Sequence, residues 1–459
     1  MEWVGSPVAL ATLRGRWVLL DFWSSGCINC VHLLPVLEAI AHRWADRLTV
    51  IGVHSGKFPA ERELVHVTHE CARRDVQHPV LNDRHFRVWR SYAVRAWPTL
   101  VLIDPAGSVV AQHAGEISVE ALYAALVRIT GYDPPLSAAA AVAERVVPQS
   151  LRYPSRIACH ADGTTIAISD SGHHRLLLGH HDAARSRLVI TQVVGGTAPG
   201  FVNGDAAQAR FHDPQGLAFA GDWLLVADRA NHAIRRVAPD TGAVTTRAGN
   251  GHRLRTDADR AAGALASPMD LCPVDGMVVI AMAGNHQLWA MPLEQRAPRV
   301  VAGTGAEGLH DGPAMEAAFA QPTGLGRTAQ SLLVADCESS AIRTVQPADA
   351  PHVGTVVGTG LFDFGDRDGV GDAVRLQHPE ALVVTADQRV LVIDRYNGAV
   401  KWVDPATRSV HTHVRGLQEP TGACALPHDG SLLVVESHAS RVVHVEADGR
   451  VTELPLHFS

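Results

Sequence analysis

The run Val18-Leu19-Leu20-Asp21-Phe22-Trp23, followed after three residues by Cys27-Ile28-Asn29-Cys30, decides the fold of the first part of the chain. The continuous apolar run is typical of a strand buried on both faces. Apolar residues recur at helical spacing from Val31 to Trp44, so the two cysteines lie where a strand meets a helix. At a helix N-terminus, unpaired N–H groups and the helix dipole stabilise a thiolate. The spacing therefore predicts a redox-active pair in which Cys27 attacks and Cys30 resolves a mixed disulfide.

Strands and helices alternate around this pair over residues 1–132. The predicted strands are 17–23, 48–53, 99–103 and 109–113, with a short extended piece at 79–81, and the predicted helices are 31–44, 61–74 and 117–129. Their order predicts an α/β domain built on a parallel sheet with one antiparallel hairpin. The segment 133–148 begins Asp133-Pro134-Pro135 and continues into an alanine run, which predicts a linker.

A different pattern occupies residues 149–459. Six segments share a proline, a small or apolar pair, and then a strand that ends in an acid in five of the six; the prolines are Pro154, Pro214, Pro268, Pro322, Pro379 and Pro420. Repeats of this length, with four short strands each, predict an all-β six-bladed propeller whose last blade ends in residues 451–456. Loops inserted between the blades are the expected binding surface.

Composition limits the compartment and the partners. The net charge of −7 argues against a nucleic acid as the main partner, and no apolar run approaches the roughly 20 residues that span a bilayer. Of the seven cysteines, all but Cys27 and Cys30 stand singly along the chain. This spacing is not that of a disulfide framework, so it favours a reducing compartment. The first residues lack the pattern of a secretory signal, so a cytoplasmic protein is expected.

The first domain resembles the thioredoxin superfamily at four places. Besides the cysteine pair, Asp21 stands six residues before Cys27, Pro35 stands five residues after Cys30, and Trp97-Pro98-Thr99 precedes a strand. The resemblance implies that Asp21 assists proton transfer and that Pro98 is a cis-proline that presents backbone to the substrate. The candidate substrate contacts beside the dithiol are Trp23, Asn29 and Trp97.

The second part resembles NHL repeats through its Pro-x-Gly-Leu and Val-Ala-Asp patterns. The combination is similar to the NHL repeat-containing protein 2 family. It implies a thiol–disulfide oxidoreductase that needs no cofactor or metal. The expected partners are an upstream thiol reductant and protein clients that the propeller binds or positions near the dithiol, with neither nucleic acid nor membrane among them.

Other interpretations stay open for single residues. Cys27 and Cys30 would make half of a zinc site, but no second cysteine or histidine pair stands at a suitable spacing. Asp21 would have a purely structural role if its carboxylate were hydrogen-bonded. Trp97 would have a purely structural role if its ring only packed in the core. Cys71 would resolve a sulfenic acid on Cys27 in peroxidase-like chemistry, although a helix cysteine is more often simply buried.

The propeller residues have alternatives as well. The acid that recurs in the blades, as in Asp228 and Asp336, is interpreted as a structural hydrogen-bond acceptor rather than a metal ligand. Two further functions remain: a redox-sensitive scaffold in which the propeller carries the function, and a propeller enzyme acting on a small molecule.

Overall fold

The computed structural model describes residues 2–134, 149–294, 298–346 and 350–459. The chain forms two compact units, residues 1–141 and 142–459. Most of the predicted linker 133–148 lies outside the described residues. No helix within the described ranges is both long and apolar enough to cross a membrane.

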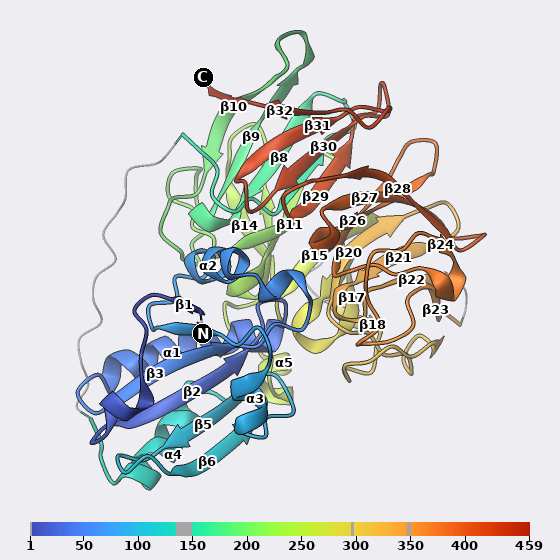
Figure 1. Cartoon of the computed structure of the whole chain (residues 1–459). Helices are drawn as coiled ribbons and strands as arrows, with labels where there is room; N and C mark the ends of the chain where they lie inside the picture. Colours follow the sequence, from blue (N-terminus) through green and yellow to red (C-terminus); the bar gives the residue numbers. More distant parts are fainter. Residues whose placement is uncertain (1, 135–148, 295–297, 347–349) are drawn as a thin grey trace. The chain divides into compact units, whose positions relative to one another are not determined.

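The first unit is built on one mixed sheet with the strand order β1-β4-β3-β2-β5-β6 (Figure 1). Its strands are β1 (Glu2–Val4), β2 (Trp17–Trp23), β3 (Leu48–His54), β4 (Val80–Asn82), β5 (Thr99–Ile103) and β6 (Val109–Ala114). Its helices are α1 (Ile28–Arg43), α2 (Leu64–Arg73), α3 (Arg87–Ser91) and α4 (Val119–Thr130). This is the predicted α/β fold.

The sheet differs from the predicted one in direction. β2, β3 and β4 run parallel, but β5 is antiparallel to β2, β6 to β5, and β1 to β4. The expectation of a parallel sheet with a single antiparallel hairpin was therefore wrong. Helices α1 and α2 return the chain for parallel pairing, whereas the segment that contains α3 delivers it to the opposite end of the sheet. The helix expected from Glu61 begins at Leu64.

Burial explains the central strand and its helices. Every residue of β2 from Val18 to Trp23 is buried, as a continuous apolar strand covered on both faces requires. On one face, α1 presents Leu33, Leu37 and Ile40 to the sheet, and α4 adds Leu122 and Leu126 to the same core. The serine before α4 caps it by accepting a backbone N–H, and Gly131 ends it in the left-handed region.

In the described residues of the second unit, six sheets repeat in chain order and form the predicted propeller (Figure 1). The blades are β7–β10 (Arg156–Cys159, Thr165–Asp170, Arg175–Asp182, Arg187–Val194), β11–β14 (Pro214–Ala220, Trp223–Asp228, Ala233–Val237, Val244–Ala248), β15–β18 (Pro268–Val274, Met277–Met282, Gln287–Pro292, Arg299–Ala302), β20–β23 (Pro322–Arg327, Leu332–Asp336, Ala341–Gln346, His352–Val357), β25–β28 (Pro379–Val384, Val390–Asp394, Ala399–Asp404, Ser409–Arg415) and β29–β32 (Pro420–Ala425, Leu432–Glu436, Arg441–Val445, Val451–Leu454). Short strands β19 (Gly312–Pro313) and β24 (Gly369–Val370) and helix α5 (Asp257–Ala261) lie in the inserted loops.

The first strands of the blades form a closed ring. β7, β11, β15, β20, β25 and β29 each contact the next, and β29 contacts β7. Gly216, Gly324 and Gly422 allow the closest approaches, because a Cβ at any of them would stand less than 3.0 Å from backbone of the following blade. The chain closes the ring a second time where β33 (Leu456–Phe458) pairs in parallel with β10. The last blade therefore ends at Leu454 rather than at Leu456 as expected.

The recurring acids hold the blades together from inside. Asp228 is fully buried, accepts the backbone N–H of His212 at 2.8 Å and pairs with Arg235 at 2.8 Å. Asp170, Asp336, Asp394 and Glu436 accept a backbone N–H in the same way. Each also has a basic partner on the next strand: Arg175, Arg343, Lys401 and Arg441. The structural interpretation of these acids is confirmed.

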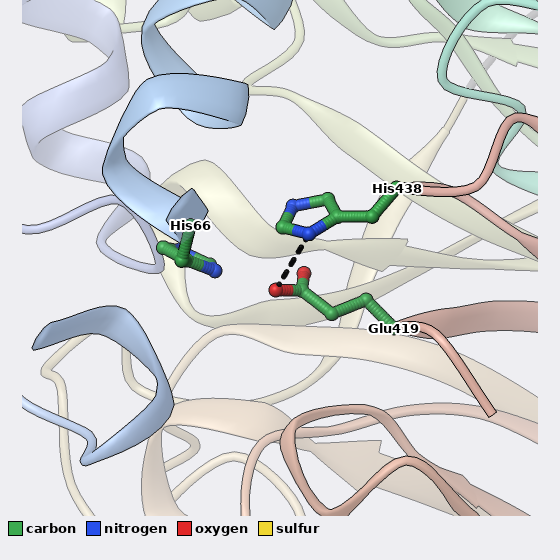
Figure 2. Close-up of side chains that lie close together, drawn as sticks. All are labelled: His66, Glu419 and His438. Carbon is green, nitrogen blue, oxygen red and sulfur yellow. Dashed lines mark ion pairs between the residues drawn. The ribbon is translucent and has the colours of Figure 1, made fainter. Parts of the chain in front are cut away.

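Further charges lie between the inner ends of the blades. Arg156 donates to the carbonyl oxygens of Thr323 at 2.9 Å and Glu380 at 2.8 Å, which belong to two other blades. Glu419 accepts from Arg395 at 2.9 Å and forms an ion pair with His438 at 3.1 Å (Figure 2). The bonds of Arg156 link blades that are not neighbours in sequence, whereas Glu419 links the fifth blade to the sixth.

Replacement of Arg235 by alanine should destabilise the propeller by about 3–5 kcal/mol near pH 8, because it leaves Asp228 buried without its cation. Burial raises the pKa of Asp228 to about 6, so protonation at pH 5 should reduce the loss. Urea unfolding at the two pH values measures both effects. Arg185→Ala, which removes the exposed partner of Asp182, should change little; an equal loss in both variants would contradict the assignment.

Candidate functional site

The two cysteines lie at the start of α1, which the loop Ser24-Ser25-Gly26 separates from β2. Cys27 is the residue that precedes the helix and is half-buried, whereas Cys30 is fully buried. Both are free thiols, and their side chains are hydrogen-bonded to each other. Burial, followed by the contact with Cys27, raises the pKa of Cys30 well above its usual value. One accessible sulfur and one protonated, protected sulfur make a suitable pair for successive attack steps.

Asp21 lies in β2 beneath this pair. It is fully buried, and neither of its carboxylate oxygens has a hydrogen-bond partner among the described residues. Burial raises its pKa to about 8, and its charge contributes to the raised pKa of Cys30. A structural acid would be expected to have partners, because an unpaired buried carboxylate is costly. The arrangement therefore favours the interpretation in which Asp21 exchanges a proton with Cys30.

The peptide bond between Trp97 and Pro98 is cis, as the resemblance implied. Thr99, the next residue, pairs with Phe22 across β5 and β2, so Pro98 lies beside the end of β2 that leads to the dithiol. Trp97 is half-buried, donates to the Ser55 carbonyl oxygen at 3.0 Å and packs in the same cluster as Cys27 and Cys30. The role of Pro98 and Trp97 in substrate binding stays a prediction.

The remaining two candidates lie at different depths. Asn29 is half-buried in the first turn of α1 between the cysteines. Trp23 is fully buried and packs edge-on against His54, with ring centroids 4.7 Å apart. The structure thus places Trp23 under the dithiol as packing, away from the surface that a substrate reaches.

Glu61 is a functional residue that the sequence analysis missed. It is fully buried and accepts hydrogen bonds from the Ser24 hydroxyl at 2.7 Å, the Ser25 hydroxyl at 3.2 Å and the Gly26 N–H at 2.7 Å. It also accepts from the Phe58 N–H at 3.2 Å. One carboxylate therefore fixes the loop that leads from β2 to Cys27. The Ser-Ser-Gly loop indicates a need for acceptors, but no spacing points to an acid so far along the chain.

Two histidines complete this anchor. His54 accepts the Ser25 N–H at 3.2 Å, and burial lowers the pKa of His54 to about 4, which keeps the ring neutral. His66, on α2, lies 2.8 Å from the Ser25 hydroxyl through Nε2 (Figure 2 shows its side chain). The loop is thus held on several sides before any substrate binds.

Cys71 lies in the apolar cluster that also contains Cys30. It is buried, and burial raises its pKa to about 12. A thiol that stays protonated in an apolar environment reacts slowly, which favours the interpretation of Cys71 as a buried core residue.

Comparison with known proteins agrees with this architecture. Residues 15–109 match the family model described as thioredoxin-like. NHL repeat-containing protein 2 of Bos taurus is 33% identical over 97% of this chain and 69% of its own length. The chain belongs to the NHL repeat-containing protein 2 family. It combines a thioredoxin-like domain with an NHL propeller, which is the organisation of a redox-related protein.

Two other matches differ in extent. The protein SUPPRESSOR OF QUENCHING 1, chloroplastic, of Arabidopsis thaliana is 34% identical over 95% of this chain, which spans only 44% of that protein. The crystal structure of an exposed lipoprotein thioredoxin of Streptococcus pneumoniae is 30% identical over 26% of this chain and 89% of its own, with a TM-score of 0.25.

Replacement of Glu61 by alanine should loosen the dithiol loop and cost about 2–4 kcal/mol of stability, because several buried donors lose their acceptor. Chemical unfolding measures the stability, and the rate of Cys27 alkylation measures the order of the loop. Glu63→Ala removes an exposed ion pair with Arg84 from the same segment and is the matched control. Unchanged alkylation in Glu61→Ala would show that the loop holds its shape without this carboxylate.

Proposed function

We propose that the protein is a thiol–disulfide oxidoreductase whose propeller binds or positions a protein client. The observation that carries this proposal is the unpartnered buried carboxyl of Asp21 beneath a half-buried and a fully buried thiol. A purely structural site gains nothing from an acid whose pKa burial raises to near neutral pH.

The reaction proceeds in two exchanges when the client is reduced. The Cys27 thiolate attacks one sulfur of the client disulfide, so that an S–S bond forms to Cys27 and the other client sulfur leaves as a thiolate. The Cys30 thiol then loses its proton to Asp21 and attacks Cys27. This closes the Cys27–Cys30 disulfide, releases the second client sulfur and transfers two electrons to the client.

The reverse sequence oxidises a client dithiol, and the reduction potential decides the direction. Continued reduction needs an upstream thiol donor that regenerates the dithiol. The propeller raises the local concentration of the client when both contacts are made together. We place the reaction in the cytoplasm, where thiols stay reduced.

The first test measures reduction of insulin disulfides with dithiothreitol as the electron donor. Wild type should exceed Cys27→Ser by at least tenfold, because the serine hydroxyl is a far weaker nucleophile than a thiolate. Cys30→Ser should accumulate mixed disulfides with clients, because the resolving thiol is missing. Cys71→Ser is the matched control and should keep wild-type activity. If wild type is no faster than Cys27→Ser, the scaffold function replaces this proposal.

The second test uses Asp21→Asn. The pKa of about 8 in the folded protein lies above the usual value of 3.8, so this acid contributes stability at low pH that is lost as the pH rises through 8. The variant should therefore be more stable than wild type by on the order of 4 kcal/mol at pH 7, with no advantage near pH 4.

The same substitution should slow insulin reduction and remove its rise between pH 7 and 9, because Cys30 loses its proton acceptor. Unfolding curves and initial rates across this range measure the two effects. Asp46→Asn, at an exposed carboxylate, should change neither. A pH profile in Asp21→Asn that matches wild type would remove Asp21 from the mechanism.

A further inference from the structure

The contact, or seam, between the first and the last blade differs from the other contacts between neighbouring blades, because only the C-terminal strand β33 crosses it and hydrogen bonds alone hold β33 to β10. Consecutive blades are joined by the chain, whereas the first blade, β7–β10, meets the last blade, β29–β32, only through side chains and backbone contacts. β29 packs against β7 on the inside, and β33 pairs with β10 on the outside. Stability of the ring therefore depends on this seam more than on the others.

The two inner strands approach closely along the seam. A Cβ on Gly422 would stand 2.7 Å from the Ser155 carbonyl oxygen and 3.0 Å from the Cα of Arg156. The Thr421 hydroxyl donates to the Pro154 carbonyl oxygen at 3.2 Å. The spacing between the strands is therefore fixed by backbone contact, and a Cβ-bearing residue at Gly422 would force them apart.

Two cysteines lie further along the same pair of inner strands, β7 and β29. Cys159 is the last residue of β7 and Cys424 lies in β29; both belong to the apolar cluster between the first and last blades. Their side chains are hydrogen-bonded to each other. Cys159 is half-buried and Cys424 is buried, so one sulfur is open to small reagents and the other is protected.

We propose that Cys159 and Cys424 are a second redox site, at which a disulfide covalently closes the propeller ring when the protein meets a peroxide. The site is independent of the exchange proposed at Cys27. Its consequence is a propeller whose first and last blades cannot separate while the disulfide persists.

The acid–base character of the pair indicates which of the two sulfurs reacts first. The hydrogen bond from Cys424 lowers the pKa of Cys159, whereas the same contact and burial raise the pKa of Cys424. Cys159 is therefore the sulfur that ionises and meets the oxidant, and Cys424 is the resolving thiol.

With hydrogen peroxide as the oxidant, the Cys159 thiolate attacks one oxygen and the O–O bond breaks. Hydroxide leaves and is protonated to water, and Cys159 becomes a sulfenic acid. Cys424 then attacks the Cys159 sulfur, the S–O bond breaks, and a second water leaves with the Cys424 proton. Two thiols are oxidised by two electrons, and one peroxide is reduced to two waters.

The test uses the full-length Cys27→Ser/Cys30→Ser variant, so that the first dithiol contributes nothing. Stoichiometric hydrogen peroxide should remove two free thiols, and peptide mapping without reductant should find the Cys159 and Cys424 peptides linked. The propeller melting temperature should rise by roughly 5 °C or more, because the bond closes a loop of roughly 260 residues. Dithiothreitol should reverse each change.

Matched variants separate this site from general oxidation. Cys272 occupies the position in β15 that corresponds to Cys424 in β29, counted from the proline of each blade, and is equally buried. Added to the background, Cys272→Ser should leave the linked peptide and the temperature shift intact, whereas Cys424→Ser should abolish both. The proposal is overturned if peroxide leaves all thiols free, converts Cys159 to sulfinic acid without a link, or links two chains.

Discussion

Hydrogen bonds from backbone N–H groups to fully buried carboxylates hold both units of this protein in shape. In the propeller, Asp228 and its counterparts each accept from a loop that precedes their own blade, and a cation on the next strand balances the charge. In the first unit, Glu61 does the same for the loop that carries the dithiol. A buried carboxylate is expensive to desolvate, so it is tolerated where several donors converge on it.

Asp21 departs from this rule and is informative for that reason. It is as buried as Glu61 or Asp228, yet its carboxylate oxygens have no hydrogen-bond partner in the described part of the chain. Its pKa rises to about 8, whereas the propeller acid Asp228, which has partners and a cation, rises only to about 6. The free energy that an unsatisfied acid costs in the resting protein is consistent with a proton-transfer role beside Cys30. The dithiol site thus combines a loop held by hydrogen bonds to Glu61 with one carboxyl, that of Asp21, that has no hydrogen-bond partner among the described residues.

Closure is the second constraint, and it acts on the propeller alone. Each blade buries one face against the next, so the ring is stable only when the last blade meets the first. The chain meets this need twice, with β29 against β7 and with β33 beside β10. The cysteine pair lies between the first and last blades, where one bond would have the largest effect, since these blades are held together without a covalent link between β7–β10 and β29–β32.

Local patterns in the sequence determined the strand–helix junction at Cys27 and the number of blades, because each depends on residues close together in the chain, and the resemblance to thioredoxins implied the cis-proline at Pro98. The repeat pattern also indicated the structural acids of the blades, and the resemblance pointed to Asp21. Only the tertiary structure decided the direction of β5, the anchoring role of Glu61, the burial of Trp23 and the transfer of β33 to the first blade. It alone brought Cys159 and Cys424, which lie near opposite ends of the propeller sequence, into one apolar cluster. The physical reason is that such contacts depend on where folding brings distant segments, and spacing along the chain carries no record of that.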